Sequence, residues 1–300
     1  MKPILDKVMV FDVGGTKTTY GVVENDVISH FDKIDSNVIN EKGIDFFIET
    51  IDKIYDEKIS GIIIGVPAVV DNNGNILSAP NLKSIESSTL KLDLQKKYSV
   101  PVHITRDVNL QLLGEYATFY KDDFKNALGI FIGTGLGASV IIDKKIYTGF
   151  NGAAVEIGHV HYPLNYNIQC NCGKKDCMEL FSSGMAIEKY VEKYNLEFDK
   201  ELSKNDFFIC QDEKIIKYKE LFFNSLSFAI STLINLFDPG LVVIGGGVIN
   251  ANEFPYDHLI EKIKSDLRAP LPKGNTIFKI SKLNYKSNIL GGSYYFKDLK

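Results

Sequence analysis

Four side chains that could bind one metal ion lie close together in the middle of this 300-residue sequence. An imidazole at His159 is followed by thiols at Cys170, Cys172 and Cys177. One imidazole and three thiolates form a complete tetrahedral set for Zn²⁺, and four protein ligands leave no open position at which the metal could activate water. The segment therefore predicts a structural zinc site, with His161 as an alternative to His159.

A disulfide framework is the alternative interpretation of these cysteines. Three clustered cysteines cannot all pair with one another, because their number is odd. The apolar run at residues 8–13 is also too short for a signal sequence or a membrane span. No other run approaches eighteen apolar residues without charge. We therefore expect a soluble, cytoplasmic protein whose thiols stay reduced. Cys210 stands apart from the cluster and is expected to be a buried, inert thiol.

The composition is that of a globular enzyme. Apolar residues make up 45% of the chain, which is ample for a packed core, and a length of 300 residues suits two domains or one large one. The net charge is −4, and the basic residues are scattered. A nucleic-acid-binding surface is therefore not expected.

Alternating strand and helix patterns predict an α/β protein. Strands are expected where short apolar runs end at glycine or proline, and helices where apolar residues recur every three or four positions. The expected strands are residues 8–13, 18–23, 61–66, 102–105, 127–132, 138–142 and 241–244, and the expected helices are 44–55, 108–120, 215–237 and 289–296.

A glycine-rich turn between two apolar strands occurs twice, at residues 14–16 and 133–135. Glycine lets the chain bend sharply, and consecutive amides at such turns form concave anion sites. The two turns together are therefore suited to binding a polyphosphate. A third glycine run, 245–247, follows another strand. None of these turns has the spacing of a Walker P-loop or of a dinucleotide fingerprint.

The order of the motifs resembles that of the ROK family of sugar kinases and repressors. The motifs are D-V-G-G-T-K at 12–17, G-T-G-L-G-A at 133–138, E-I-G-H at 156–159 and C-N-C-G-K-K-D-C-M-E at 170–179. The resemblance implies an actin-like sugar-kinase fold, with two ribonuclease-H-like domains flanking an active-site cleft. We expect a smaller α/β domain of residues 1–118 plus 286–300. The larger α/β domain, 119–285, would carry the zinc loop 156–179.

The resemblance also implies phosphoryl transfer from ATP, with Mg²⁺, to the 6-hydroxyl of a hexose. Asp107 would be the base that accepts the hydroxyl proton; from the residues alone, it could equally cap the following helix. Asp12 would face Mg²⁺ through water. The residues implied for nucleotide binding are Gly14, Gly15, Thr16, Lys17, Gly133, Thr134, Gly135, Gly245 and Gly246, and Lys17 has the alternative of an ordinary solvated lysine.

The implied sugar-binding residues are carboxylates, an amide, an imidazole and a guanidinium. In the family, the histidine of E-x-G-H binds zinc with one ring nitrogen and a sugar hydroxyl with the other. Zinc would thereby fix the orientation of the ring. The residues are Asn81, Arg106, Asp107, Glu156, His159 and Glu179.

Two positions depart from the common family pattern. Arg106 stands where most hexose-binding members have Asn, near the C3 side of the sugar, and segments 104–112, 234–239 and 267–272 resemble members that act on D-allose. D-allose is inverted at C3 relative to glucose, and a fork of five donors suits an inverted hydroxyl. Arg106 could instead face outward and pair with a surface acid. The alternative substrates are glucose, N-acetylmannosamine and a β-glucoside.

The second departure is Asp176, which replaces a glycine before the last zinc cysteine. A carboxylate beside thiolates is mildly unfavourable, and Lys174 and Lys175 are expected to offset it.

Sensor functions fit the sequence less well. Repressors of the family carry an N-terminal helix-turn-helix, whereas only seven residues precede residue 8. A sugar binder without catalysis would not need two phosphate turns. We therefore expect an enzyme with a hexose and Mg·ATP as its partners, no nucleic-acid or membrane partner, and the homodimeric state common among relatives.

Overall fold

The computed structural model describes residues 7–56, 58–251 and 253–299, and it divides the chain into two compact units. Unit 1 comprises the described residues up to Asp123, Ser139–Ala154, and the described residues from Lys282 onward. Unit 2 comprises Phe124–Ala138 and Val155–Ser281. Compared with the expected domains, unit 1 additionally contains Ser139–Ala154, a hairpin that follows the second glycine turn.

A five-stranded sheet forms the centre of unit 1. Its strands are β1 (Lys7–Val13), β2 (Lys17–Glu24), β3 (Val27–Asp35), β4 (Ile59–Val66) and β7 (Val102–Arg106), in the order β3-β2-β1-β4-β7. β1 pairs with β2 in antiparallel orientation and with β4 in parallel orientation, and β7 lies parallel to β4. The carboxyl ends of β1, β4 and β7 therefore meet at one edge of the sheet, where ligands bind in open α/β folds.

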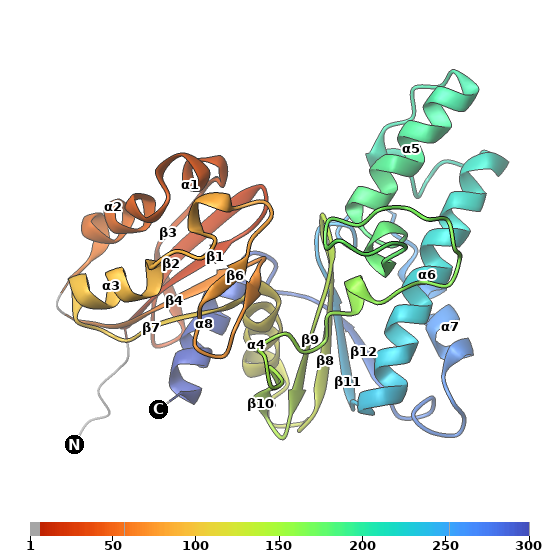
Figure 1. Ribbon diagram of the computed structural model, residues 1–300. Helices are drawn as coiled ribbons and strands as arrows, with labels where there is room; N and C mark the ends of the chain where they lie inside the picture. Colours follow the sequence, from red (N-terminus) through yellow and green to blue (C-terminus); the bar gives the residue numbers. More distant parts are fainter. Residues whose placement is uncertain (1–6, 57, 252, 300) are drawn as a thin grey trace. The chain divides into compact units, whose positions relative to one another are not determined.

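Helices cover both faces of this sheet (Figure 1). α1 (Asn37–Lys42), α2 (Ile44–Ile54) and α3 (Leu90–Tyr98) pack on one face with Met9 and Phe11 of β1. α4 (Asp107–Phe119) and α8 (Lys286–Asp298) pack on the other face with Val8 and Val10. Successive side chains of a strand point to opposite faces. The continuous apolar run in β1 therefore serves two cores.

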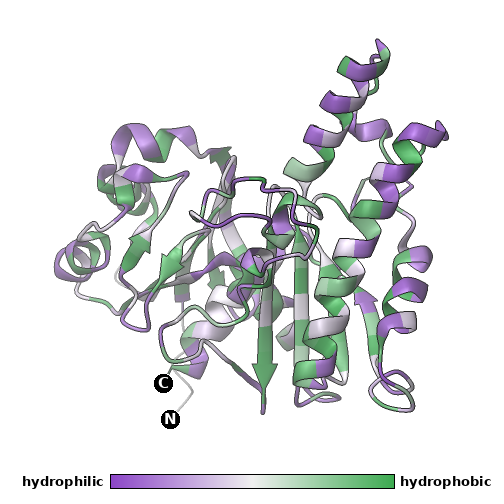
Figure 2. Ribbon diagram, turned by 45° about the vertical axis from the view of Figure 1, so that its right-hand side comes forward, coloured by the Kyte–Doolittle hydropathy of each residue, from purple (hydrophilic) through white to green (hydrophobic). Residues whose placement is uncertain are grey.

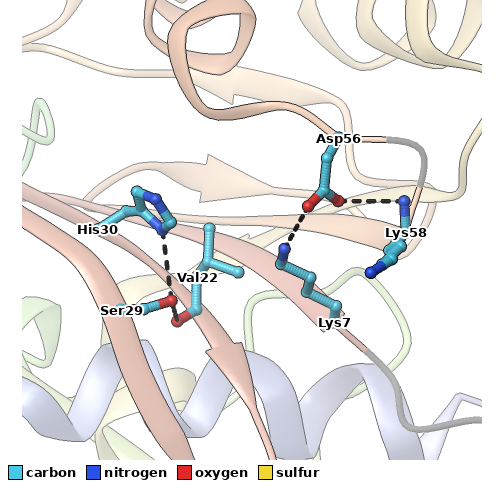
Figure 3. Close-up of polar contacts among 6 residues, drawn as sticks. All are labelled: Lys7, Val22, Ser29, His30, Asp56 and Lys58. Atoms are coloured by element: carbon cyan, nitrogen blue, oxygen red, sulfur yellow. Dashed lines mark hydrogen bonds and ion pairs between the residues drawn. The ribbon is translucent and has the colours of Figure 1, made fainter.

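Polar contacts hold the ends and the outer strands of this sheet (Figure 3). Lys7 Nζ lies 2.5 Å from Asp56 Oδ2, just before β4. Ser29 Oγ of β3 donates to the Val22 carbonyl of β2 at 3.3 Å. The β2–β3 register shifts nearby, where His30 has a φ of 50°. Such a bulge strengthens the local twist of an edge pair.

The second sheet repeats the strand order of the first. Its strands are β8 (Ala127–Ile132), β9 (Leu136–Ile142), β10 (Lys145–Ile146), β11 (Leu241–Gly245) and β12 (Ile277–Ile280), in the order β10-β9-β8-β11-β12. β11 is parallel to both β8 and β12. The strand–turn–strand repeat expected from the sequence is confirmed, because β1–β2 and β8–β9 occupy equivalent places in the two sheets.

The helices of unit 2 are α5 (Gly184–Phe198), α6 (Glu213–Phe237) and α7 (Tyr256–Asp266). Short elements complete the chain: β5 (Val69–Val70), β6 (Ile76–Ser78), η1 (Lys83–Ile85), η2 (Ile157–His159), η3 (Met178–Leu180) and η4 (Lys204–Asp206).

Within the described residues, α6 alone is long and apolar enough to cross a membrane, by length and composition. The stretch 221–237 carries no charge. However, 56% of its most apolar window is buried inside the protein, and Figure 2 shows hydrophobic, intermediate and hydrophilic residues interspersed along the helix. A core helix of a globular protein has the same character.

Candidate functional site

The first glycine turn directs its carbonyl groups onto Ser36. The Gly14 carbonyl accepts from Ser36 Oγ at 2.7 Å, and the Thr16 carbonyl accepts from Ser36 N at 3.0 Å. Gly14 N closes the turn on the Lys17 carbonyl at 3.0 Å. Within the described part of the chain, the exposed N–H groups of Gly15 and Thr16 donate no hydrogen bond. Two adjacent amides thus remain available for an anion.

Asp12 lies at the carboxyl end of β1, beside this turn. Its Oδ1 accepts from Asn288 Nδ2 at 2.6 Å, and its Oδ2 accepts from Thr19 Oγ1 at 3.4 Å. Burial, followed by the nearby charge of Asp107, raises the pKa of Asp12 to about 7, against the opposing hydrogen bonds from Asn288 and Thr19. A carboxyl group with such a pKa favours a cation as its neighbour.

Asp107 is the first residue of α4, directly after β7. Its Oδ1 accepts from Val108 N at 2.8 Å, and its carbonyl accepts from Asn288 Nδ2 at 3.3 Å. The carboxylate thus binds one N–H of the first turn, but the N-cap position that the alternative interpretation gave to Asp107 is occupied by Arg106. At the same time Asp107 is half-buried and close enough to Asp12 to perturb it. Asn288 contacts both residues and fixes their spacing.

Lys17 and Asn81 flank the turn. Lys17 Nζ lies 3.0 Å from Asp35 Oδ2 in an ion pair whose side chains are both about half exposed. This is the ordinary solvated lysine that the sequence left open. Asn81 is exposed, and its Nδ2 would lie 3.8 Å from a Cβ built on Gly15. Its carbonyl is held by Asn40 Nδ2 at 2.9 Å.

Arg106 is buried, with 7% of its surface exposed, and its Nη1 donates to the Ala154 carbonyl at 2.6 Å. The outward-facing alternative therefore does not describe this side chain. Arg106 also lines a cavity of about 460 Å³ within unit 1, together with Lys91, His103 and Thr148. None of the other sugar-binding residues expected from the sequence, all of which lie in the described part of the chain, lines this cavity.

The metal-binding residues converge as expected. The ligand atoms of His159, Cys170, Cys172 and Cys177 all lie within 4.8 Å of one another, and the cysteines are free. Cys170 Sγ is 3.8 Å from His159 Nδ1, and Cys172 Sγ is 3.5 Å from Cys177 Sγ. Bonds of about 2.3 Å from Zn²⁺ to sulfur require ligand separations of about 3.8 Å in a tetrahedron. The donor set therefore fits a zinc ion.

The geometry distinguishes the two candidate histidines. His161 does not belong to the cluster; its Nδ1 lies 3.3 Å from the Lys175 carbonyl. Without a metal, burial raises the pKa of Cys177 to about 12, so that its thiol is neutral. A bound divalent cation would replace that proton, because a metal-bound thiol is deprotonated.

Asp176 has a different role from the one expected. Its carboxylate is buried and accepts from Asn167 N and Ile168 N, each at 2.9 Å. The backbone φ of 52° explains why a glycine suits this position and why Asp, which tolerates this region, can replace it. The expected compensation by lysines is therefore corrected: two amides satisfy the carboxylate, and Lys174 Nζ instead donates to the His159 carbonyl at 2.8 Å.

The second glycine turn has the same design as the first. The Gly133 carbonyl accepts from Gly184 N at 2.8 Å, and the Thr134 carbonyl accepts from Met185 N at 3.1 Å, both at the start of α5. Gly133 N donates to the Gly135 carbonyl at 3.0 Å. The N–H groups of Thr134 and Gly135 make no hydrogen bond within the described residues. Here too the carbonyls are occupied and the amides are available.

In the sequence, the two glutamates lie on either side of the four clustered metal-binding candidates, all within unit 2. Glu156 precedes η2 and is half-buried, and the residue before it, Val155, has a φ of 63°. A β-branched residue in this region is strained, and such strain is common at functional sites. Glu179 lies in η3, and its Oε2 accepts from Leu136 N at 3.0 Å.

The third glycine run follows β11. Gly246 has a φ of 100°, and a Cβ there would lie 2.3 Å from the Ile132 carbonyl oxygen. No other residue type fits. A Cβ on Gly245 would lie 2.7 Å from Cβ of Ser281. The chain therefore passes close to β8 at this point.

The model of the ROK family matches residues 8–299 of the chain. The chain belongs to the ROK family. An N-acetyl-D-glucosamine kinase of Pectobacterium atrosepticum is 28% identical over 279 residues, which cover 88% of this ROK protein and 91% of the relative. A glucokinase of Halalkalibacterium halodurans is 31% identical over 255 residues, covering 79% and 76% of the two chains.

Solved structures confirm the actin-like sugar-kinase fold of the family. A ROK family glucokinase from Streptomyces griseus, solved in complex with glucose and AMPPNP, superposes with a TM-score of 0.80. The match is 22% identical in sequence and covers 96% of this ROK protein and 98% of that chain.

Three supporting residues of this ROK protein escaped the sequence analysis. Ser36 holds the first turn, and Asn288 joins Asp12 to Asp107. Asn109 is buried; its Nδ2 donates to Thr105 Oγ1 at 3.1 Å, and its Oδ1 accepts from Ser139 Oγ at 2.7 Å. Asn288 could have been recognised as a single amide side chain within an apolar helix pattern. Nothing in the sequence around Ser36 indicates its contacts with the turn.

Proposed function

We propose that this ROK protein transfers the γ-phosphoryl group of ATP to the 6-hydroxyl of a hexose. The observation that carries the proposal is the arrangement of Asp12 and Asp107 at the carboxyl ends of β1 and β7. Asn288 bridges the two residues, and a glycine turn with two available amides follows β1. The names of two curated relatives, N-acetyl-D-glucosamine kinase and glucokinase, support the same reaction class.

In the proposed reaction, the Asp107 carboxylate accepts the proton of the 6-hydroxyl as that oxygen attacks the γ-phosphorus. The bond from the γ-phosphorus to the bridging oxygen breaks, and ADP leaves with the electron pair. Mg²⁺ bound with ATP supplies positive charge that neutralises the phosphate oxygens. Asp12, with its preference for a neighbouring cation, would hold this ion through water.

The amides of the two glycine turns would bind the phosphate oxygens. Gly15 and Thr16 supply them in unit 1, and Thr134 and Gly135 supply them in unit 2. Because each turn has its carbonyls fixed elsewhere, the amide dipoles are oriented before the nucleotide binds. The remaining proposed nucleotide contacts are Gly14, Lys17, Gly133, Gly245 and Gly246, the last two for adenosine.

The proposed sugar contacts are hydrogen-bonding side chains. His159 has its Nδ1 towards the thiols, so its Nε2 remains to donate to, or accept from, a sugar hydroxyl. Zinc would hold the ring in that orientation. The other proposed contacts are Asn81, Arg106, Asp107, Glu156 and Glu179.

The proposed hexose is D-allose. The proposal rests on Arg106 and on sequence resemblance, because neither relative described above is named for D-allose. Arg106 is buried, and its Nη1 donates to the Ala154 carbonyl, which fixes the orientation of the planar guanidinium. Leaving one buried polar group unpaired costs about 1–3 kcal/mol, which corresponds to roughly 5- to 150-fold between epimers. Glucose, N-acetylglucosamine, N-acetylmannosamine and a β-glucoside are the alternatives.

Initial rates of ADP release test both the kinase activity and the choice of D-allose as substrate. D-allose should give the highest kcat/KM in a panel of these sugars, and Arg106→Asn should shift the preference towards glucose. If the wild type prefers N-acetylglucosamine and Arg106→Asn leaves this preference unchanged, the D-allose assignment is wrong but the proposed kinase activity stands. No sugar-dependent ADP release would contradict the kinase.

The proposal also includes a cytoplasmic location and a homodimer. Sedimentation velocity across a range of protein concentrations would test the dimer.

A further inference from the structure

The second glycine turn is held by the chain segment that leaves the zinc cluster. This segment, 177–185, starts at a zinc ligand and ends in the first turn of α5. Its amides at Gly184 and Met185 donate to the Gly133 and Thr134 carbonyls. Between the zinc ligand and these amides, Glu179 reaches the other end of the turn. The segment therefore contacts the turn at both its ends.

Glu179 contacts the turn in two ways. Its Oε2 accepts from Leu136 N at 3.0 Å, and a Cβ built on Gly135 would lie 2.2 Å from the same oxygen. Gly135 does not have a positive φ, so its backbone alone would accept an alanine. Because that oxygen ends a flexible side chain, an alanine at Gly135 would displace the Glu179 carboxylate from Leu136 N.

Three consecutive amides, those of Thr134, Gly135 and Leu136, belong to this turn. The first two are available for an anion, and the third is taken by Glu179. Fixing the third amide limits the directions that the first two can adopt. A binding group that is fixed before the ligand arrives loses less entropy on binding.

We propose that Glu179 is a positioning residue for the phosphate-binding turn, so that nucleotide affinity depends on this carboxylate even when no sugar is present. The inference rests on the proposed function and deepens it. A Glu179 that served only as a sugar contact would leave nucleotide binding in the absence of sugar unchanged.

The test is a double-mutant cycle on zinc-loaded protein, with Mg·AMPPNP affinity measured by isothermal titration calorimetry without sugar. Glu179→Ala should weaken binding about fivefold to twentyfold, because the Leu136 amide loses its acceptor. Gly135→Ala should weaken binding to a similar degree in the wild-type background. It should cost less than about twofold in the Glu179→Ala background, because the obstructing oxygen is gone.

Two comparison variants make the cycle specific. Glu179→Gln keeps an oxygen acceptor for Leu136 N and should recover most of the affinity that Glu179→Ala loses. Gly133→Ala adds a methyl group that meets no atom within 4 Å, so its effect should be additive with Glu179→Ala.

The outcomes separate this inference from the proposed function. If wild-type protein binds Mg·AMPPNP and Gly135→Ala has the same effect in both backgrounds, the positioning role is wrong and the kinase proposal stands. Unchanged nucleotide affinity in Glu179→Ala leads to the same conclusion. If the wild type binds no Mg·AMPPNP without sugar, the inference fails, and ADP release in the presence of sugar decides the proposed function separately.

Discussion

At the scale of single residues, the ligand atoms of His159 and of three cysteines lie within 4.8 Å of one another. His159 and the three cysteines were predictable because their residue types and spacing define a zinc ligand set, and the structure brings them together. The partner of Arg106 was not predictable, because Ala154 lies far away in sequence and contributes only a carbonyl. The amides that donate to the Asp176 carboxylate were not predictable either, because they belong to the backbone and no residue type marks them.

The central residue prediction concerns Asp107. Asp107→Asn removes the proton acceptor and should lower kcat about 10²- to 10⁴-fold, while calorimetric sugar affinity changes only a few-fold. Asp45→Asn, at an exposed position in the first turn of α2, is the matched control and should retain wild-type kcat. A kcat for Asp107→Asn within threefold of wild type would exclude the proposed base.

A second residue prediction concerns pH. The folded-state pKa of Asp12, about 7, lies above the ordinary value of 3.8 for an aspartate, so folded protein holds a proton that unfolded protein releases. The free energy of unfolding should therefore decrease as pH rises from about 4 to 7. Asp12→Asn removes this dependence and should stabilise metal-free protein by about 2–4 kcal/mol at pH 8, with little effect at pH 4.

Urea denaturation of both proteins at pH 4 and pH 8, without Mg²⁺ or nucleotide, measures this difference. An equal stability difference at the two pH values would show that Asp12 does not titrate between them.

At the scale of elements, buried segments were predictable and exposed ones were not. β1, β4 and β8 stand out because both faces are covered and their sequences are continuously apolar. β3 is an edge strand that is almost entirely exposed, and its sequence V-I-S-H-F-D-K-I-D gave no signal. α3 was missed because only Leu90, Leu94 and Tyr98 are buried.

The zinc loop provides an element prediction that separates neighbouring histidines. His159→Ala should lose stoichiometric zinc in native mass spectrometry and lower the melting temperature, because a metal ligand is removed. His161→Ala should keep the metal, because that ring lies outside the cluster. Zinc retained by His159→Ala and lost by His161→Ala would reverse the assignment.

The same loop depends on Asp176. Asp176→Gly permits the positive φ but leaves the amides of Asn167 and Ile168 without their acceptor, and it should destabilise the protein by about 2–3 kcal/mol. Asp199→Gly is the matched control, because Asp199 has a similar φ of 48° at the exposed end of α5. Its stability should match or exceed that of the wild type.

Thermal unfolding and the rate of zinc release to a chelator would measure both variants. Equal melting temperatures for the two would mean that the Asp176 contacts contribute nothing.

At the scale of the whole molecule, the repeated motif was a sound guide to the repeated sheet. Two glycine turns about 120 residues apart correspond to two sheets with the same strand order. The place of Ser139–Ala154 in unit 1 was not predictable, because the strand β9 continues unbroken through the division at Ala138.

The most direct test of the account is product analysis after incubation with Mg·ATP and a hexose. Phosphorus NMR and mass spectrometry should find a hexose 6-phosphate and an equal amount of ADP, with D-allose converted fastest. The corresponding 6-deoxyhexose should yield no phosphorylated product, because it lacks the attacking oxygen. Phosphate on another hydroxyl, or release of inorganic phosphate without a sugar phosphate, would contradict the central claim.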